Sequence, residues 1–411
     1  MSERVVITGL GILTCNAKGK DEFWQALKDG RHGFRPATIF ETDPFRTNIV
    51  GEISDFDATV FLGPKGLRTM DRATRLVVSA GRLAVKDSGL VINDDNTDDI
   101  GVAVGTTLGS ITSIAQFDEI TLKEGPRYTN PALFPNTVIN SPASHISIWE
   151  NIQGFNTTIS TGFTASMDAL NYAYDFIQTD QSKVIYAGGV EEMSYYTFYG
   201  FYALEYLSGS KEGQEYINCP FDKRRNGATF GEGACIMAFE DYDHALKRGA
   251  NILGEVAGFG YAFDPYRLDR YNPRGICVKE AIKDALDNAG MSTDDIDYIC
   301  SNGNSTRAVD KIETRAIKEV FGERAYKIPV STIKSMVGEC YSVSGAFGVA
   351  AGLGVLNQGF IPPTIGYKEK DADCDLDYVP NKARNAKADN ILIINFGPGP
   401  ACCMILKRYK R

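Results

Sequence analysis

Apolar residues along the chain occur as short runs that end in glycine and as longer segments with helical spacing. The short runs predict buried strands at residues 4–13, 100–104, 183–187, 234–240, 252–258, 298–300, 328–332 and 390–395. Apolar positions three and four apart predict helices at residues 21–29, 70–88, 243–248, 275–289 and 344–356. Strands that alternate with helices are typical of an α/β fold.

The same order of elements starts again near residue 255. Each half has a strand with a polar glycine turn, a strand that turns sharply into a helix, and a strand with a glycine-rich exit. A pattern that repeats over this length indicates a duplicated architecture. We therefore predict two similar halves, residues 1–255 and residues 256–411.

The stretch TTISTGFTASMDAL at residues 157–170 has the pattern of a nucleophile elbow. Thr157, Thr158 and Ile159 form a β-branched run that predicts a buried strand, and the glycine turn after it leads into a helix. Amide groups and the helix dipole at such a turn lower the pKa of a thiol and hold an anion. The residue at the tip is Phe163, which can neither attack a carbonyl nor accept a proton.

Composition excludes several classes of function. The net charge of −9 weighs against nucleic acid and anionic membranes as partners. The longest apolar segment, residues 345–356, is shorter than the ~20 residues that span a bilayer, and no N-terminal targeting signal is visible. Nine cysteines without a CxxC pair indicate buried thiols in a reducing compartment, the cytoplasm, with no disulfide frame and no metal site.

Other candidate chemistry is weaker. The Gly9-Leu10-Gly11 turn lacks a third glycine, so no dinucleotide or other cofactor is expected. A relocated nucleophile at Cys340 would stand beside Glu339, and a neighbouring carboxylate raises the pKa of a thiol. Ser160 and Ser166 have no histidine base nearby in the sequence. The arginines of the helix at 70–88 and just before it are interpreted as a solvated face: Arg68, Arg72, Arg75 and Arg82.

Seven ordered segments together resemble the β-ketoacyl synthase family of the thiolase superfamily, over residues 4–406. They are VVITGLGILT, FPNTVINSPASHISI, NTTISTGFTASMDAL, CPFDKRRNGATFGEGA, SNGNSTRAVDKIET, STIKSMVGECYSVSGA and NFGPGPACCMI. The resemblance implies a thiolase-like layered αβαβα fold built from two duplicated halves. It also implies a cysteine nucleophile and two histidines, which together condense acyl and malonyl thioesters.

Carried over position by position, none of these three catalytic groups is present. The cysteine falls on Phe163, the first histidine on Asn302 and the second on Glu339. Lys334, Asp310 and Glu313 match retained positions, and we expect them to form a buried charge network that Glu339 joins.

That combination is similar to the chain-length-factor subunit (ketosynthase-β) of type II polyketide synthases. Such subunits pair with a catalytic ketosynthase-α, and we expect the acyl carrier protein to dock mainly on that partner. Many carry glutamine at the cysteine position with a decarboxylase-like role, which Phe163 cannot play. The resemblance places the interface at Thr157, Thr158, Ile159 and Ser160, and the tunnel wall at Thr107, Ile111, Ile114, Phe117 and Phe134.

Two alternatives stay open. The chain could be a diverged condensing enzyme or thioester hydrolase that uses Cys340 or a serine, or a homodimeric scaffold. The helical spacing of Ile111, Ile114 and Phe117 equally fits an ordinary core stripe.

Overall fold

The computed structural model describes residues 3–267 and 270–410, and its framework is an 11-stranded mixed sheet. The strand order is β11-β10-β14-β15-β9-β1-β8-β7-β5-β6, with β2 paired to β1. The strands of this sheet are β1 (Val5–Thr14), β2 (Ala17–Lys18), β5 (Ile100–Gly105), β6 (Asn156–Ile159), β7 (Val184–Glu191), β8 (Gly233–Asp241), β9 (Gly254–Phe263), β10 (Tyr298–Cys300), β11 (Val330–Ser331), β14 (Asn390–Phe396) and β15 (Pro400–Lys407). Two small pairs lie apart from it, β3 (Arg35–Pro36) with β4 (Ile49–Val50) and β12 (Phe360–Ile361) with β13 (Arg384–Asn385).

The strand order repeats between the two halves of the chain. In the first half β5 is parallel to β6 and β7, and β8 and β1 follow antiparallel. In the second half β10 is parallel to β11 and β14, and β15 and β9 follow antiparallel. The two sets join where β1 pairs antiparallel with β9. The duplicated α/β architecture is therefore confirmed, while the division at residue 255 stays a prediction.

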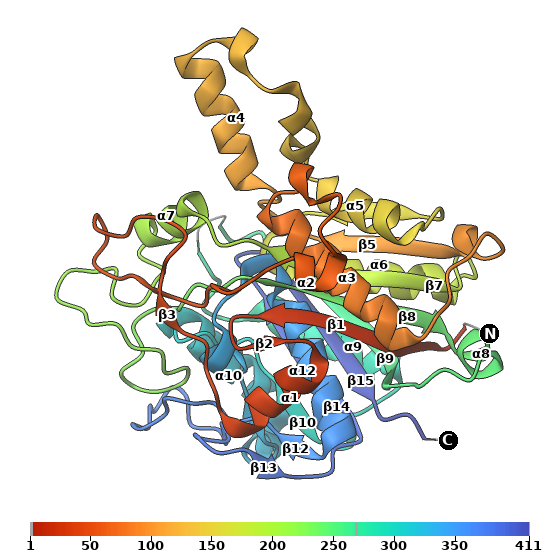
Figure 1. The fold of residues 1–411 in the computed structure, drawn as a ribbon. Coiled ribbons are helices and arrows are strands. Elements are labelled where there is room, and N and C mark those ends of the chain that lie inside the picture. Colours follow the sequence, from red (N-terminus) through yellow and green to blue (C-terminus); the bar gives the residue numbers. More distant parts are fainter. Residues whose placement is uncertain (1–2, 268–269, 411) are drawn as a thin grey trace.

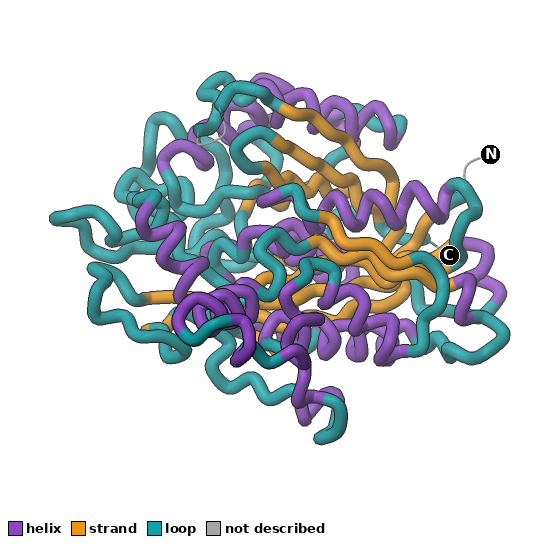
Figure 2. Tube along the Cα trace, turned by 90° about the horizontal axis from the view of Figure 1, so that it is seen from above, coloured by secondary structure: helices purple, strands orange, loops and turns teal. Residues whose placement is uncertain are grey.

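Helices cover both faces of each half-sheet, so that the layers alternate (Figures 1 and 2). α6 (Ala165–Gln178) and α12 (Ser344–Gln358) form the middle layer, where each contacts strands of both halves. α3 (Arg72–Ser88) and α5 (Ser141–Glu150) cover the first half, and α9 (Ile276–Ala289) and α10 (Arg307–Phe321) cover the second. This is the predicted αβαβα arrangement. The other helices are α1 (Lys20–Asp29), α2 (Thr59–Leu62), α4 (Ile111–Lys123), α7 (Tyr195–Ala203), α8 (Tyr242–Lys247) and α11 (Lys334–Val337).

Small residues allow α12 to lie in the middle layer. Residues 344–356 of this helix are all buried, and four of them are glycine. A Cβ at Gly354 would come within 2.6 Å of the Trp24 ring, and one at Gly345 within 2.3 Å of the Met167 side chain. Such close packing excludes larger side chains, which explains the apolar, glycine-rich segment in the sequence.

One local prediction was wrong. The run Thr157–Ile159 is not a buried strand, because β6 is the last strand of the sheet and its residues are half-buried or exposed. Two further elements complete the second half. Residues 334–337 form the short helix α11, and the chain after β14 returns as the strand β15, whose residues are buried except at its two ends.

One segment projects from the body of the molecule, as Figure 1 shows for α4. We call residues 111–137 the arm; it consists of α4 and the 3₁₀ turns Pro126–Tyr128 and Pro131–Thr137. No residue of α4 is buried. Two buried carboxylates hold the base of the arm: Leu108 N donates to Glu191 Oε1 at 3.3 Å, and Thr112 N donates to Glu192 Oε1 at 3.1 Å.

Candidate functional site

The elbow places Phe163 at the junction between β6 and α6. Gly162 adopts a φ of +75°, which favours glycine, and the 3₁₀ turn Gly162–Thr164 leads directly into α6. The Phe163 side chain is 8% exposed, and its ring lies edge-on to Tyr341 with centroids 4.6 Å apart. A Cβ at Gly397 would lie 2.7 Å from Phe163 Cδ2, so the ring packs against the backbone of the loop after β14.

The two positions of the expected histidines lie in one buried polar network. Asn302, just after β10, donates from Nδ2 to Phe396 O at 3.1 Å, and its Oδ1 accepts from Lys334 Nζ at 2.7 Å. The same ammonium donates to Glu339 Oε2 at 2.9 Å. The structure therefore brings Asn302 and Glu339 together around Lys334.

Both oxygens of the Glu339 carboxylate accept further hydrogen bonds in this network. Oε2 also accepts from Asn304 Nδ2 at 2.9 Å, and Oε1 accepts from Ser344 Oγ at 2.7 Å. The Lys334 and Glu339 side chains are 4% and 0% exposed. A buried ion pair is tolerated when hydrogen bonds satisfy its remaining atoms, and this pair meets that condition.

In the expected charge network Lys334 pairs with Glu339, while Asp310 and Glu313 bind backbone amides of the loop after β10. Asp310 accepts from the backbone amides of Phe221 and Asn304, at 2.6 and 2.9 Å, and faces Arg225 Nε at 3.6 Å. Glu313 Oε1 accepts from Asn302 N at 2.6 Å. Burial raises the pKa of Asp310 to about 6 and that of Glu313 to about 8, against the effect of these hydrogen bonds. The two carboxyls thus position the loop after β10.

A cavity of about 1160 Å³ opens beside the Phe163 ring. Its wall is mostly aromatic: Phe163, Phe201, Tyr206, Tyr261, Phe263, Tyr271 and Tyr341. Thr107 also lines it and donates from Oγ1 to Gly162 O at 3.0 Å. The cavity adjoins the Lys334 network at Tyr206, whose hydroxyl accepts from Asn304 Nδ2 at 2.7 Å.

The alternative nucleophiles have no base. Cys340 is fully buried, its thiol lies 3.5 Å from Val337 O, and burial raises its pKa well above the usual value. Ser166 Oγ accepts from Ala346 N at 3.1 Å. The polar partners of these two groups are backbone atoms, which cannot activate them.

The predicted tunnel and interface residues lie at the periphery. Ile111, Ile114 and Phe117 are half-buried on α4, so a core stripe was the wrong alternative. Phe134 is 58% exposed, and its ring lies 6.3 Å from that of Phe117. Of this group only Thr107 reaches the cavity.

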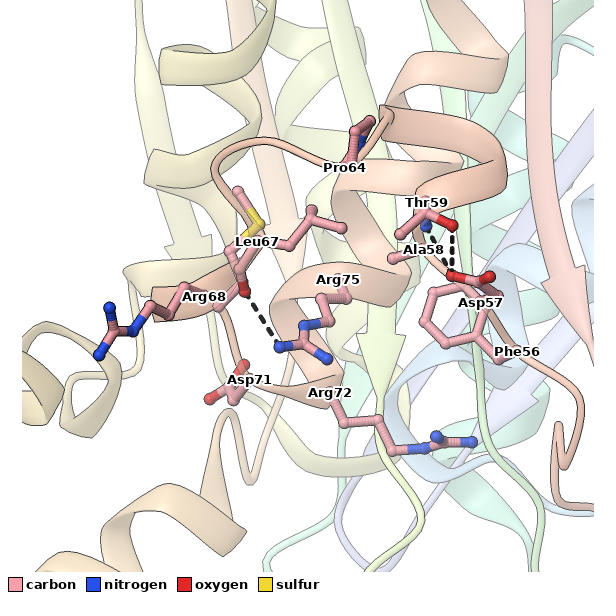
Figure 3. Close-up of a pocket in the computed structure, with 11 residues that line it drawn as sticks. Phe56, Asp57, Ala58, Thr59, Pro64, Leu67, Arg68, Asp71, Arg72 and Arg75 are labelled. Carbon is pink, nitrogen blue, oxygen red and sulfur yellow. Dashed lines mark hydrogen bonds between the residues drawn. The ribbon is translucent and has the colours of Figure 1, made fainter.

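The arginines at the start of α3 are not a simple solvated face. Figure 3 shows a pocket of about 500 Å³ with Arg68, Arg72 and Arg75 in its wall. Arg72 Nε donates to the buried Glu232 at 2.8 Å, and Arg75 Nη2 donates to Leu67 O at 3.0 Å. Arg82 pairs with Glu150 at 3.0 Å. Three of the four arginines thus hold the fold together.

Sequence reasoning missed the residues that complete the site from other segments. Phe201 and Tyr206, which belong to the aromatic run at 195–207, line the cavity. Asn304 is the residue that links Tyr206 to Glu339, with its Nδ2 2.7 Å from the Tyr206 hydroxyl. A polar residue two positions after Asn302 was the available signal. Within residues 3–267 and 270–410, no cluster of three or more metal-ligating side chains is found, and no helix is long and apolar enough to cross a membrane.

Comparison with known proteins gives a consistent result. Residues 2–245 match the family model "Beta-ketoacyl synthase, N-terminal domain", and residues 253–368 match "Beta-ketoacyl synthase, C-terminal domain". The 3-oxoacyl-[acyl-carrier-protein] synthase 2 of Coxiella burnetii is 36% identical over 397 residues, which cover 96% of each chain. The tetracenomycin polyketide synthase ketoacyl synthase alpha subunit of Streptomyces glaucescens is 36% identical, over 97% of this chain and 95% of its own.

Solved structures agree. A chain of the ishigamide ketosynthase/chain length factor superposes with a TM-score of 0.93 at 32% identity and covers both chains fully. A chain of AntDE:AntF, a type II polyketide synthase acyl-carrier protein in complex with its ketosynthase, has a TM-score of 0.91 at 27% identity, again over the full length of both.

Proposed function

The chain belongs to the β-ketoacyl synthase family, and within that family we propose that it is a non-catalytic chain-length-factor subunit. It would pair with a ketosynthase-α to form the heterodimeric ketosynthase of a type II polyketide synthase. In that complex it would shape the tunnel that receives the growing chain and help to set the chain length, while the covalent chemistry stays on the partner.

One observation carries the proposal: residues other than cysteine and histidine stand at all three positions where the resemblance places the catalytic groups. A phenyl ring packed against Gly397 fills the nucleophile position. Asn302 and Glu339, at the histidine positions, are bound to Lys334 at 2.7 and 2.9 Å. Neither an amide nor an ion-paired carboxylate supplies the neutral imidazole that decarboxylation in this family requires. The relatives named above are enzymes by name, so the loss of catalysis is proposed for this chain and not for them.

Two surfaces support pairing with a second subunit. β6 ends the sheet, and Thr158 Oγ1 is buried there without a hydrogen-bond partner among the described residues. An uncovered edge strand is a ready template for a strand from another chain. The projecting arm carries apolar side chains that its own body does not bury, Ile111, Ile114, Phe117 and Phe134. We propose that the arm reaches the partner and forms part of its tunnel wall.

Co-expression with the neighbouring ketosynthase gene tests the pairing. We expect the two chains to co-purify as a 1:1 complex in native mass spectrometry. A matched variant, Thr158→Pro, removes a backbone donor from β6 and should weaken the complex. Recovery of this chain as a stable homodimer that ignores the ketosynthase would favour the scaffold alternative instead.

Incubation with an acyl-carrier thioester tests the loss of catalysis. We expect no covalent adduct on this chain by intact-mass analysis, and an acyl adduct on the ketosynthase in the same sample. An adduct at Cys340 or at any serine of this chain would favour the diverged enzyme. The AntDE:AntF structure holds a carrier protein with its ketosynthase; we propose that the carrier of this pathway docks mainly on the partner.

A further inference from the structure

The base of the arm is held by two buried acids that have no task in the function proposed above. The chain leaves the body for the arm directly after β5, beside the end of β7, where Gly105 pairs with Gly189. The last residue of β7 is Glu191, and Glu192 follows it. Their side chains are buried. The two acids therefore lie at the place where the arm begins.

Glu191 joins the base of the arm to a distant segment of the chain. Its Oε2 accepts from Thr107 N and its Oε1 from Leu108 N, both at 3.3 Å. The Ser342 hydroxyl, in the 3₁₀ turn Tyr341–Val343, donates to the same carboxylate. Hydrogen bonds from backbone amides to a carboxylate are strong and fix the path of the main chain. Glu191 thus sets the direction in which the chain leaves β5.

Glu192 holds the other side of the same turn. Its Oε1 accepts from Thr112 N in the first turn of α4, and its Oε2 accepts from Ala73 N on α3, each at 3.1 Å. Amides in the first turn of a helix have no partner inside the helix, so an outside acceptor anchors its start. Gly109 lies between the two anchored segments, and its φ of +55° favours glycine.

The arm amplifies any change at its base. α4 begins at Ile111 and projects from the body with no buried residue (Figure 1). With a rise of about 1.5 Å per residue, Phe117 lies about 9 Å beyond Ile111 along the helix axis. A rotation of about 10° at the base therefore moves Phe117 by about 1.5 Å, roughly one carbon–carbon bond length. Each condensation adds two carbon atoms, so the angle of the arm matters on the scale of one chain unit.

We propose that Glu191 is a positioning residue for chain length, which fixes the angle of the arm by holding Thr107 and Leu108. The inference rests on the proposed function, because it requires that the apolar residues of the arm meet the chain that grows on the partner. Glu191 does not touch that chain. It acts through the arm, and Glu192 holds the far side of the turn.

The angle of the arm can be measured without reference to any partner. Spin labels at Leu122→Cys on α4 and Val60→Cys on α2 occupy positions that are 85% and 75% exposed, while the nine native cysteines are buried. In double electron–electron resonance on the full chain, we expect Glu191→Ala to widen the distance distribution at least twofold. Glu191→Gln keeps a carbonyl for Leu108 N and an amide that can donate to Ser342 Oγ, so it should cause less than half of that widening.

The matched control is Asp87→Ala. Asp87 also accepts from a backbone amide, Leu10 N at 2.9 Å, but it lies about 22 Å from Arg72 along α3, at the end remote from the arm. The control should leave the distribution unchanged. Where Glu191→Ala does not fold, Ser342→Ala removes the hydroxyl on the other side of the carboxylate and should widen the distribution in its place. Equal widening in Asp87→Ala, or none in a folded Glu191→Ala or Ser342→Ala variant, would overturn the inference.

Chain length is measured on the complex with the co-expressed ketosynthase, supplied with carrier protein and malonyl thioester. By mass spectrometry of the products, we expect Glu191→Ala to lower the ratio of the main chain length to all others at least threefold. Glu191→Gln and Asp87→Ala should keep the native ratio within twofold. A merely structural role would lower the total amount of product at an unchanged ratio. An unchanged ratio in a working complex overturns the inference alone, whereas a native chain that forms no complex refutes the proposed function and the inference with it.

Discussion

At the elbow the side chain of Phe163 meets other rings, whereas at the loops after β10 and β11 the side chains of Asn302 and Glu339 meet hydrogen-bonding groups. On the elbow side the half-buried carboxylate of Asp168 is held by two threonine hydroxyls, and the buried Glu191 accepts from Thr107 N at 3.3 Å. The loop side holds Lys334, Glu339 and Glu313, all buried. Apolar packing thus fills the elbow side, and a satisfied polar network fills the loop side.

The difference follows from the charge on each side. Lys334 lies buried on the loop side, and a buried ammonium needs an anionic partner, which Glu339 supplies at 2.9 Å. The Phe163 ring is uncharged and packs against other rings, so its burial needs no counter-ion. We conclude that the buried charge of Lys334 constrains position 339 more tightly than ring packing constrains position 163.

The largest effect should come from breaking the polar side. Lys334→Met leaves Glu339 buried without its cation, and we expect the free energy of unfolding to fall by about 3–5 kcal/mol in urea denaturation. The control Lys318→Met breaks a half-exposed pair with Asp375 and should cost less than about 1 kcal/mol. Adding Glu339→Gln to Lys334→Met should recover part of the loss. An equal loss of unfolding free energy in Lys334→Met and Lys318→Met would contradict the special role of the buried ion pair on the loop side.

A smaller effect should come from the apolar side. Phe163→Ala removes ring contacts with Tyr341 and Phe201, and we expect a loss of about 3 kcal/mol, at the low end for buried phenylalanine because the ring borders an existing cavity. Thermal and urea unfolding measure it. Phe134→Ala, at an exposed position of the arm, serves as the control and should cost less than about 0.5 kcal/mol in the isolated chain.

The two sides should also differ in their response to pH. Burial raises the pKa of Glu313 to about 8, against about 4.3 in the unfolded chain. The native state therefore binds more protons between these values, and this contribution to stability, complete below about pH 4.3, is lost as the pH rises through 8. We expect Glu313→Gln to flatten the fall in stability between about pH 5 and 8 by up to about 1.4 kcal/mol per pH unit.

The control for this experiment is Phe163→Leu, which changes no titrating group and should leave the pH profile as it is. Glu191 and Glu192, at the base of the arm, have pKa values raised by burial to about 8 and about 7, so part of the slope will remain in Glu313→Gln. If Glu313→Gln leaves the slope of stability against pH unchanged, Glu313 does not contribute to the pH dependence.

The smallest expected effect is on catalysis. Phe163→Cys returns a thiol to the elbow, but Asn302 and Glu339 still supply no imidazole, and we expect no condensation of malonyl-carrier and acyl-carrier thioesters above the level of the native chain. The nine native cysteines are buried, so iodoacetamide labelling should report the new thiol selectively. The variant must be folded, and its new thiol must react with iodoacetamide in a separate sample. Measurable condensation by such a variant would refute the proposed loss of catalysis.

Much of the fold was predictable because its signals are local. Apolar runs such as Val5–Thr14 and the spacing of Arg72–Ser88 follow from the period of a strand or helix, and the repeat of these patterns predicted the duplicated sheet. The elbow and its unreactive tip were also visible, since Phe163 stands inside one continuous motif. The prediction failed for a short element. β6 has the composition of a buried strand, yet its burial depends on which strands lie beside it.

Residue types alone told us that Phe163, Asn302 and Glu339 supply neither a nucleophilic thiol nor an imidazole, and that Lys334 needs a counter-ion. They could not tell which carboxylate provides it, because Glu313, Asp310 and Glu339 are all within reach in principle. The packing of the loops after β10 and β11 selects Glu339, and leaves Asp310 and Glu313 to bind backbone amides. Which carboxylate lies next to Lys334 depends on how segments distant in the chain pack together. Local sequence patterns therefore cannot specify the partner.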